Sequence, residues 1–228
     1  MPDAAETFVR WYLRFNGYLG VENFVVHEPR AGRVGQGAES DILAVRFPHS
    51  REDVGAPLQT HHALVPQPEA NPVVDFVIAE VKAGNRAPLN SIWTRPSTPD
   101  KVRRVAYLLR WLGPFQEDST ISELASELQA HHQVLRDGYR FRVVFFSKRH
   151  RKPVHQLGIQ QITFDQIADF LVNVRAACWR RYGLGARSDH SQWDPLILKA
   201  WQLADPDRTV AAHQKVQDVL ALLNPASA

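Results

Sequence analysis

The sequence predicts an α/β domain in which helices flank a small mixed sheet, and three features indicate it. Apolar and aromatic residues recur at helical spacing over residues 4–19. A strongly apolar run at residues 73–81 is typical of a strand buried on both faces of a sheet. Another strand-like run at residues 139–147 leads to a helical pattern at residues 163–182. Strands that alternate with helices in this way indicate a layered α/β domain.

Length and composition are those of a globular protein. The chain has 228 residues, of which 44% are hydrophobic and 22% charged, enough to build a full core. A single cysteine, Cys178, excludes a disulfide framework and a cysteine-rich zinc finger. Residues 1–7 are polar and acidic, unlike a signal peptide, and no apolar run is long enough to span a membrane. We therefore expect a cytoplasmic protein with no membrane partner.

The first half of the chain supplies most of the predicted sheet. Aliphatic runs predict strands at residues 21–27 and 40–47, before the strand at residues 73–81. Three glycines between the first two runs predict a loop over residues 29–37. Residues 48–72 contain five prolines and no periodic pattern, which predicts an irregular insertion. A loop of this length inside a domain is often functional.

The second half of the chain is mainly helical, with one further strand at residues 139–147 after an Asp137–Gly138 turn. Periodic apolar residues predict its helices at residues 99–112, 120–135, 163–182, 195–203 and 208–223. We therefore divide the chain into a domain over residues 1–182 and a C-terminal helical extension over residues 183–228.

The third predicted strand ends in Glu80 and Lys82, the part of the sequence that carries most chemical information. Side chains alternate along a strand, so these two point to the same face. Asp41 opens the aliphatic run of the preceding strand, and Glu39 stands two residues before it as a possible substitute. If the two strands pair antiparallel, Asp41 lies beside Glu80 and Lys82 where the strands leave the core.

Such a cluster has the chemistry of a metal site. Two carboxylates a few ångströms apart repel each other unless a cation lies between them. Carboxylate oxygens and waters are the ligands that Mg²⁺ prefers, and a bound metal ion activates water and neutralises charge on a phosphate. Lys82 can orient the attacking water or stabilise developing charge. Two carboxylates, a metal ion and a lysine are the groups that hydrolysis of a phosphodiester bond by this route requires. The alternative is an ordinary ion pair at a strand end, because Glu-x-Lys is a common pattern.

The order of elements, together with these residues, resembles the PD-(D/E)xK nuclease superfamily, which has the restriction-endonuclease-like fold. The matching segments are AETFVRWYLRFNGYL with Glu6, ESDILAV with Asp41, and FVIAEVKAG with Glu80 and Lys82. The strand YRFRVVFFS and the helix ITFDQIADFLVNVRA resemble the end of that core. The resemblance covers residues 3–182. It implies an α-β-β-β-α-β core with a small mixed sheet flanked by helices, followed by a C-terminal helical tail.

The resemblance also implies roles for individual residues. Asp41 and Glu80 would hold Mg²⁺ or Mn²⁺, with the carbonyl of Val81 as a further ligand, and Lys82 would assist the attacking water. Glu6 matches a first-helix glutamate that faces the metal in some members, and otherwise it compensates the helix dipole. Two departures stand beside this match. The interval between the aspartate and the Glu-x-Lys motif is long, and a serine precedes the aspartate where the family often has proline.

Basic residues near the predicted strand ends are candidates for contacting phosphates. The chain carries 21 arginines and 6 lysines, and the planar fork of arginine suits phosphate, although a GC-rich genome would also favour arginine. Trp93 either stacks on a base or belongs to the core. The candidates follow the strands at residues 73–81 and 139–147, and they are Arg86, Arg95, Lys148, Arg149, Arg151 and Lys152.

Several other chemistries lack their motifs. The chain has no His-Glu-x-x-His pattern, no Gly-x-Ser-x-Gly elbow and no phosphate-binding P-loop. We therefore expect a Mg²⁺-dependent deoxyribonuclease whose partner is DNA. One alternative is a catalytically inactive module of the same fold that binds DNA or a partner protein, and another is a nuclease that processes RNA. The C-terminal helices are candidates for forming a homodimer or docking a partner protein.

Overall fold

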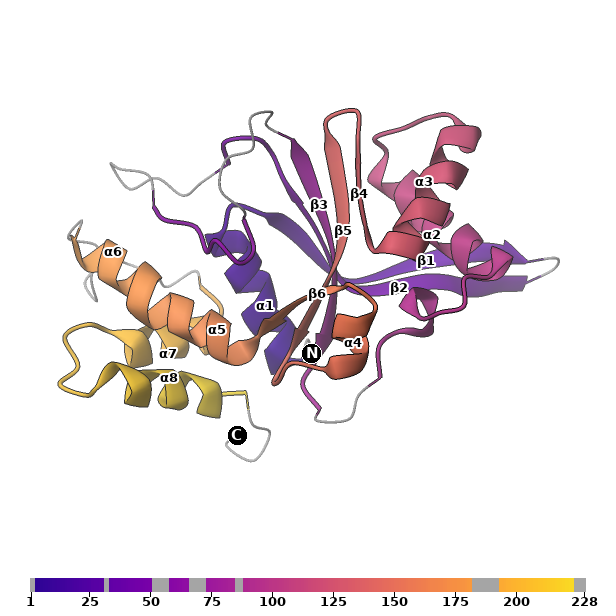
Figure 1. The fold of residues 1–228 in the computed structure, drawn as a ribbon. Coiled ribbons are helices and arrows are strands. Elements are labelled where there is room, and N and C mark those ends of the chain that lie inside the picture. Colours follow the sequence, from indigo (N-terminus) through magenta and orange to yellow (C-terminus); the bar gives the residue numbers. More distant parts are fainter. Residues whose placement is uncertain are drawn as a thin grey trace.

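The computed structural model describes residues 3–30, 33–50, 58–65, 73–84, 88–181 and 193–223 (Figure 1). Its sheet runs in the order β1-β2-β3-β5-β4, and β6 pairs with the end of β5. The strands are β1 (Leu19–Arg30), β2 (Arg33–Arg46), β3 (Val74–Lys82), β4 (Gln133–Arg136), β5 (Tyr139–Ser147) and β6 (Gln160–Thr163). The helices are α1 (Ala4–Phe15), the 3-10 turn η1 (Ser91–Trp93), α2 (Pro99–Leu112), α3 (Asp118–His131), α4 (Lys152–Gln156), α5 (Phe164–Asp169), the π-helix η2 (Phe170–Arg175), α6 (Ala176–Arg181), α7 (Pro195–Ala204) and α8 (Ala212–Ala221). The predicted α/β architecture, a mixed sheet flanked by helices, is confirmed.

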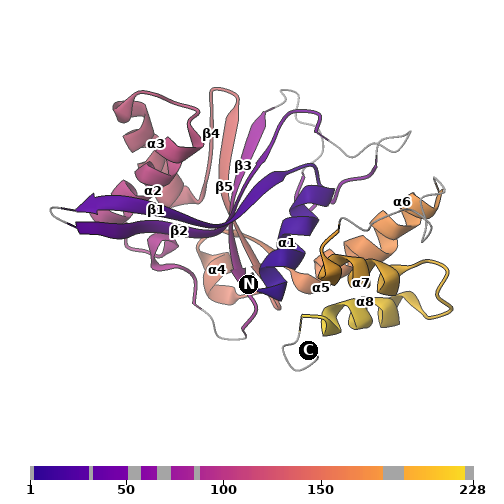
Figure 2. The same cartoon turned by 180° about the vertical axis from the view of Figure 1, so that it is seen from behind.

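The sheet separates two hydrophobic cores, one on each face. Val77, Ala79 and Val81 of β3 belong to the core beneath α1, α5, α7 and α8, which we call the α1 face. Phe76 and Ile78 belong to the core beneath α2 and α3, which we call the α2 face. Figures 1 and 2 show the two groups of helices on opposite sides of the strands. Because β3 buries side chains on both faces, its sequence is mostly apolar, and Asp75 and Glu80 are its buried charged residues.

Strand directions bring several chain segments to one edge of the sheet. β2 and β3 are antiparallel, whereas β3, β5 and β6 are parallel. Their last residues therefore lie side by side, Lys82 beside Ser147 and Ser147 beside Thr163. We call this place the C-terminal edge of the sheet. In parallel sheets the carboxyl ends of the strands are the usual position for ligands.

The glycine-containing segment expected to be a loop is mostly strand. β1 and β2 form a long antiparallel hairpin that pairs as far as Arg30 with Arg33, and the register shifts between Val26 and His27. The prediction of a loop over residues 29–37 is wrong, because backbone pairing with β1 overrides the poor strand propensity of glycine.

The helix expected over residues 120–135 is shorter and is followed by a strand. α3 ends at His131, because His132 adopts a left-handed conformation (φ 60°) that an α-helix cannot continue through. Residues 133–136 form β4, which turns at Asp137–Gly138 and pairs with β5. Both turn residues have positive φ, as a two-residue hairpin requires. α4 and β6 were not predicted, since each is short and mostly polar.

The described part of the proline-containing insertion packs into the α1 core. Leu58 and Leu64 are buried there. His61 stacks on Phe170, and its Nδ1 lies 2.6 Å from the Tyr12 hydroxyl. Residues 51–57 and 66–72 lie outside the described part. Residues 58–65 therefore act as a packing segment over α1, which the irregular sequence pattern did not indicate.

The C-terminal helices share the α1 core. Ile197 and Trp201 of α7 and Val219 of α8 are buried with α1 and α5 residues. α8 begins at Ala212, four residues later than the predicted helix, after turns around Asp205. The long helix predicted from residue 163 contains a π-helical segment at η2, and a capping box between Thr163 and Gln166 begins it. Within the described ranges, no helix is long and apolar enough to cross a membrane.

A buried ionic cluster ties β3 to β5 at the opposite end from the C-terminal edge. Asp75 on β3 accepts hydrogen bonds from Arg140 Nε (3.0 Å) and Arg142 Nη2 (2.7 Å) on β5. The Tyr18 hydroxyl also donates to Asp75, and Arg142 reaches the carbonyl of Leu64 at 2.7 Å. Burial raises the pKa of Asp75, but the two arginines outweigh it and hold the pKa below its usual value. The cluster therefore joins β3, β5, the start of β1 and the insertion.

Candidate active site at the C-terminal edge of the sheet

The antiparallel pairing of β2 with β3 brings Asp41 to the end of β3. The strand register pairs Ile42 with Ala79, so the next pair outward is Asp41 with Glu80. Asp41 Oδ2 accepts a hydrogen bond from the backbone N–H of Val81 at 2.6 Å. The carboxylate thus takes the place of a ladder bond and is fixed to β3. The expected juxtaposition of Asp41 with the Glu-x-Lys motif is present.

Glu80 is a buried carboxylate with an incomplete set of partners. Its side chain is 1% exposed, on the α2 face of β3. Trp93 Nε1 donates to Oε1 at 3.2 Å. The other oxygen, Oε2, is buried and accepts no hydrogen bond of good geometry from the described residues; Lys82 Nζ lies 3.4 Å from it. Burial, reinforced by the charge of Asp41 and opposed by Lys82, raises the pKa of Glu80 to about 7.

Lys82 lies between the two carboxylates. Its Nζ is 2.9 Å from Asp41 Oδ2 and 3.4 Å from Glu80 Oε2. Burial lowers the pKa of Lys82, but the hydrogen bond that Lys82 donates to Asp41 and the two negative charges outweigh it, so the pKa lies above its usual value. The lysine is therefore a firmly charged ammonium group that reaches both acids. This position suits a group that neutralises charge or orients a water.

Glu6 comes to the same region from α1. Burial, and next the charge of Asp41, raise the pKa of Glu6; Glu22 contributes less. This repulsion places the Glu6 carboxylate within electrostatic reach of Asp41. Its position in the first turn of α1 also favours a negative charge, since the helix dipole is positive there. The structure thus brings the Glu6 carboxylate within electrostatic range of Asp41, and both of its expected roles are compatible with this placement.

The donors present fit a hard divalent cation in part. Asp41 and Glu80 supply carboxylate oxygens, and Glu80 Oε2 lacks a good hydrogen-bond donor. In an extended residue the N–H and C=O point to the same side, so the carbonyl of Val81 faces the β2 side, where its N–H meets Asp41. Among the described residues, no group of three or more acidic, histidine or cysteine side chains could surround one ion. A metal here would be held by two carboxylates and a carbonyl, completed by waters.

Two hollows lined by basic residues adjoin the C-terminal edge. One of about 450 Å³ is lined by Gly84, Ser147 and the run from Lys148 to Pro153. The other, of about 410 Å³, lies between Ala83, Phe164 and α8. Lys148 and Arg149 line both. Ser147 is the register partner of Lys82, so the basic run that starts at Lys148 begins one residue beyond the level of Lys82 at the C-terminal edge of the sheet.

The other basic candidates are placed differently. Arg95 is exposed in the segment after η1 and lines neither hollow; its charge acts on His132. Arg86 lies outside the described residues, and so does the side chain of Glu39. The structure therefore assembles Lys148, Arg149, Arg151 and Lys152 along one surface next to the site, and it does not join Arg95 to them.

Trp93 is the site residue that sequence reasoning assigned least well. It is a sequence candidate for stacking on a base or for the core, and the structure buries it with its indole N–H donating to Glu80. Gln129 and His132 hold the turn that carries Trp93, and the sequence does not link either residue to this site. No local signal in the sequence links these residues to Glu80, because the contacts join residues 13 to 39 positions apart.

Comparison with known proteins adds no relative. No protein-family model matches the chain, and no match was found among curated proteins or among solved structures. The chemistry of this edge is therefore argued from its own geometry.

Proposed function

We propose that the chain is a metal-dependent nuclease that hydrolyses phosphodiester bonds in DNA, built on a restriction-endonuclease-like arrangement of its sheet. The observation that supports this most is the convergence of Asp41, Glu80 and Lys82 at one edge of the sheet. Two acids and a lysine in contact, with a buried carboxylate oxygen that lacks a good donor, are the groups needed to hold Mg²⁺ or Mn²⁺ and to handle a water. Glu6 lies close enough to act on the same charge.

The proposed mechanism divides the work among these side chains. Asp41, fixed by the Val81 N–H, and Glu80 would hold the cation, with the Val81 carbonyl as a further ligand. A divalent ion bound there would neutralise charge at the phosphate and lower the pKa of a water. Lys82 would orient the attacking water and stabilise the charge that develops on the leaving oxygen as its bond to phosphorus breaks. Glu6 would add negative charge on the Asp41 side of the site.

The basic run next to the edge supports a nucleic-acid substrate. Lys148, Arg149, Arg151 and Lys152 line a hollow that continues outward from the end of β5. Lysine and arginine side chains at this position suit backbone phosphates on either side of the scissile bond. Contacts of this type hold a strand in register without selecting a base sequence.

A cleavage assay tests the proposal. Plasmid DNA, single-stranded circular DNA and a structured RNA are incubated with Mg²⁺, Mn²⁺ or EDTA, using wild type, Asp41→Asn and Lys82→Ala. Lys199→Ala, which removes an exposed lysine of α7, is the matched control. We expect metal-dependent cutting of DNA that both site variants lose and the control keeps. Preferential cutting of RNA would move the activity to RNA processing, and intact substrates in every metal would contradict a nuclease.

One observation favours a second candidate, a catalytically inactive module of the same fold. Lys82 already compensates the charge of Asp41 and approaches Glu80, so the cluster is an internally neutralised ion pair without any metal. In that case the basic run would bind DNA, or the outer sides of α7 and α8 would dock a partner protein or a second copy. DNA retention on a gel without cleavage, unchanged in Lys82→Ala, supports this candidate.

A further inference from the structure

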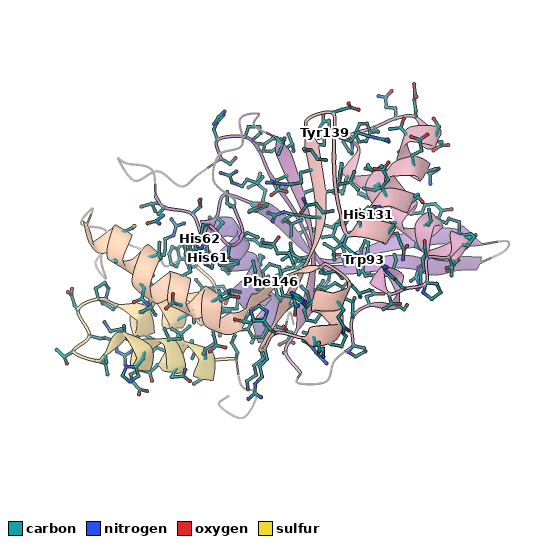
Figure 3. The ribbon with its side chains drawn as sticks, viewed as in Figure 1. His61, His62, Trp93, His131, Tyr139 and Phe146 are labelled. Atoms are coloured by element: carbon teal, nitrogen blue, oxygen red, sulfur yellow. The ribbon has the colours of Figure 1, made fainter. Side chains whose placement is uncertain are left out.

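Trp93 holds one oxygen of Glu80 and leaves the other without a good donor. The indole is 1% exposed and donates from Nε1 to Oε1 at 3.2 Å. Oε2 is the oxygen on the side of Lys82, at 3.4 Å from Nζ. Figure 3 places Trp93 on the side of the sheet that carries α2 and α3. The two oxygens of the buried carboxylate are therefore distinguished by a neutral, fixed donor on one of them only.

The turn that carries Trp93 is fixed through its carbonyl groups. His132 Nε2 lies 2.9 Å from the Trp93 carbonyl oxygen. Gln129 Nε2 donates to the carbonyls of Ile92 and Thr94, at 3.3 Å each. Lys101 Nζ donates to the Thr94 carbonyl at 2.7 Å. Because α2 and α3 hold consecutive carbonyls of this turn, the indole keeps its place and Glu80 cannot rotate without losing its donor.

We propose that Trp93 is a positioning residue that makes Glu80 a one-oxygen ligand and thereby selects Mg²⁺ or Mn²⁺ over Ca²⁺. This inference rests on the metal site in the proposed function. An N–H directed at Oε1 competes with a cation for that oxygen, whereas Oε2, on the side of Lys82, has no such fixed neutral donor. Mg²⁺ demands octahedral geometry with single carboxylate oxygens and waters, whereas Ca²⁺ takes more oxygens and often both from one carboxylate. A carboxylate that offers one oxygen disfavours the larger ion.

Titration calorimetry on the full chain tests this without any cleavage assay. Mn²⁺ and Ca²⁺ are titrated separately into wild type and Trp93→Phe, which keeps an aromatic ring but removes the N–H. We expect the ratio of the Ca²⁺ to the Mn²⁺ dissociation constant to fall by about tenfold, the usual scale for losing an outer partner of a metal ligand. Trp111→Phe is the control, since Trp111 is 67% exposed at the end of α2.

A second variant protects the test from a folding defect. Incorporation of β-(3-benzothienyl)alanine at position 93 replaces the N–H by sulfur and keeps the shape of the indole. A lower ratio of the Ca²⁺ to the Mn²⁺ dissociation constant in Trp93→Phe and in the benzothienyl variant, with the ratio of Trp111→Phe unchanged, supports the inference. An unchanged ratio in the benzothienyl variant, or a wild type that binds neither ion, overturns it. Selective Mn²⁺ binding by a wild type that cuts no nucleic acid would contradict the nuclease proposal and leave the role of Trp93 standing.

Discussion

Lys82 Nζ lies 2.9 Å from Asp41 Oδ2, so the last residue of β3 is bonded to a side chain that enters from β2. The two residues are 41 positions apart in the chain, and the contact exists because the strands are antiparallel. It gives Lys82 a second task beside chemistry, since the ammonium offsets the repulsion between Asp41 and Glu80. A change at Lys82 should therefore alter both the reaction and the stability of the folded state.

Replacing Lys82 by methionine separates these tasks. The side chain keeps its length but loses its charge, so we expect cleavage to fall by about 100-fold or more, the scale for losing a group that stabilises developing charge. Thermal stability in EDTA should also fall, because Asp41 and Glu80 then repel each other without compensation. Saturating Mg²⁺ should restore stability but not activity. The cleavage rate and the melting temperature are measured for Lys82→Met and for the control Lys199→Met. Activity retained by Lys82→Met would exclude a role for the ammonium in the reaction.

Glu80 makes stability depend on pH in an unusual direction. Its folded pKa of about 7 lies above the unfolded value near 4.5, so the native state binds more protons between these values. Stability should therefore fall as pH rises from about 4.5 to 7 and stay reduced above pH 7, by about 3 kcal/mol at about 1.4 kcal/mol per pKa unit.

Urea unfolding at several pH values, in EDTA, measures this effect for Glu80. The difference between wild type and Glu80→Gln isolates the contribution, because the histidines that titrate in the same range are common to both proteins. We expect wild type to lose stability relative to Glu80→Gln as pH rises, and Mg²⁺ to recover the loss by favouring the ionised carboxylate. A difference that stays flat from pH 5 to 8 would show that Glu80 ionises at an ordinary pKa.

The sequence predicts the elements near the site better than the contacts within it. The apolar run of β3 and the aliphatic run of β2 are periodic enough to locate Asp41, Glu80 and Lys82 at strand ends, and antiparallel pairing brings them together. Local signals failed where pairing over a distance decided the structure. Glycines in β2 became strand because β1 lies beside them, and residues 133–136 left a helical pattern to pair with β5.

Trp93 illustrates the same limit inside the site. Its contact with Glu80 depends on the short turn η1 and on where α3 packs against that turn, and a local sequence pattern does not determine either placement. The buried Asp75 cluster is similar, because Tyr18, Asp75 and Arg142 come from three strands or strand ends and form one group only after the sheet is assembled. Charged residues within apolar strands are the one signal that could have indicated it.

Asp75→Asn tests how strongly that cluster holds the sheet. The change leaves the Arg142 guanidinium buried without its counter-charge, which typically costs about 3–5 kcal/mol. The pKa of Asp75 is lowered in the folded state, so its contribution is complete above the ordinary aspartate pKa and is lost as pH falls through the lower folded value. The free energy of unfolding measured at pH 7 should therefore fall by this amount in Asp75→Asn.

Asp100→Asn is the control for this substitution. It breaks an exposed pair with Arg103 and should cost less than about 1 kcal/mol. Equal effects of the two substitutions would contradict a structural role for the cluster.

The basic run after β5 makes a prediction about salt. Lys148 and Arg149 line both hollows beside the candidate site, so phosphates that pass the carboxylates should meet them first. In the background of Asp41→Asn, which should not cut, Lys148→Gln together with Arg149→Gln should weaken DNA binding at all sequences alike. The slope of log affinity against log salt should decrease by about 2, roughly 1 for each lost phosphate contact. Fluorescence anisotropy with a labelled oligonucleotide at several salt concentrations measures this, with Lys199→Gln as the matched control. An unchanged slope would place the DNA backbone elsewhere on the molecule, because a cation that contacts phosphate cannot be removed without changing the number of counterions released.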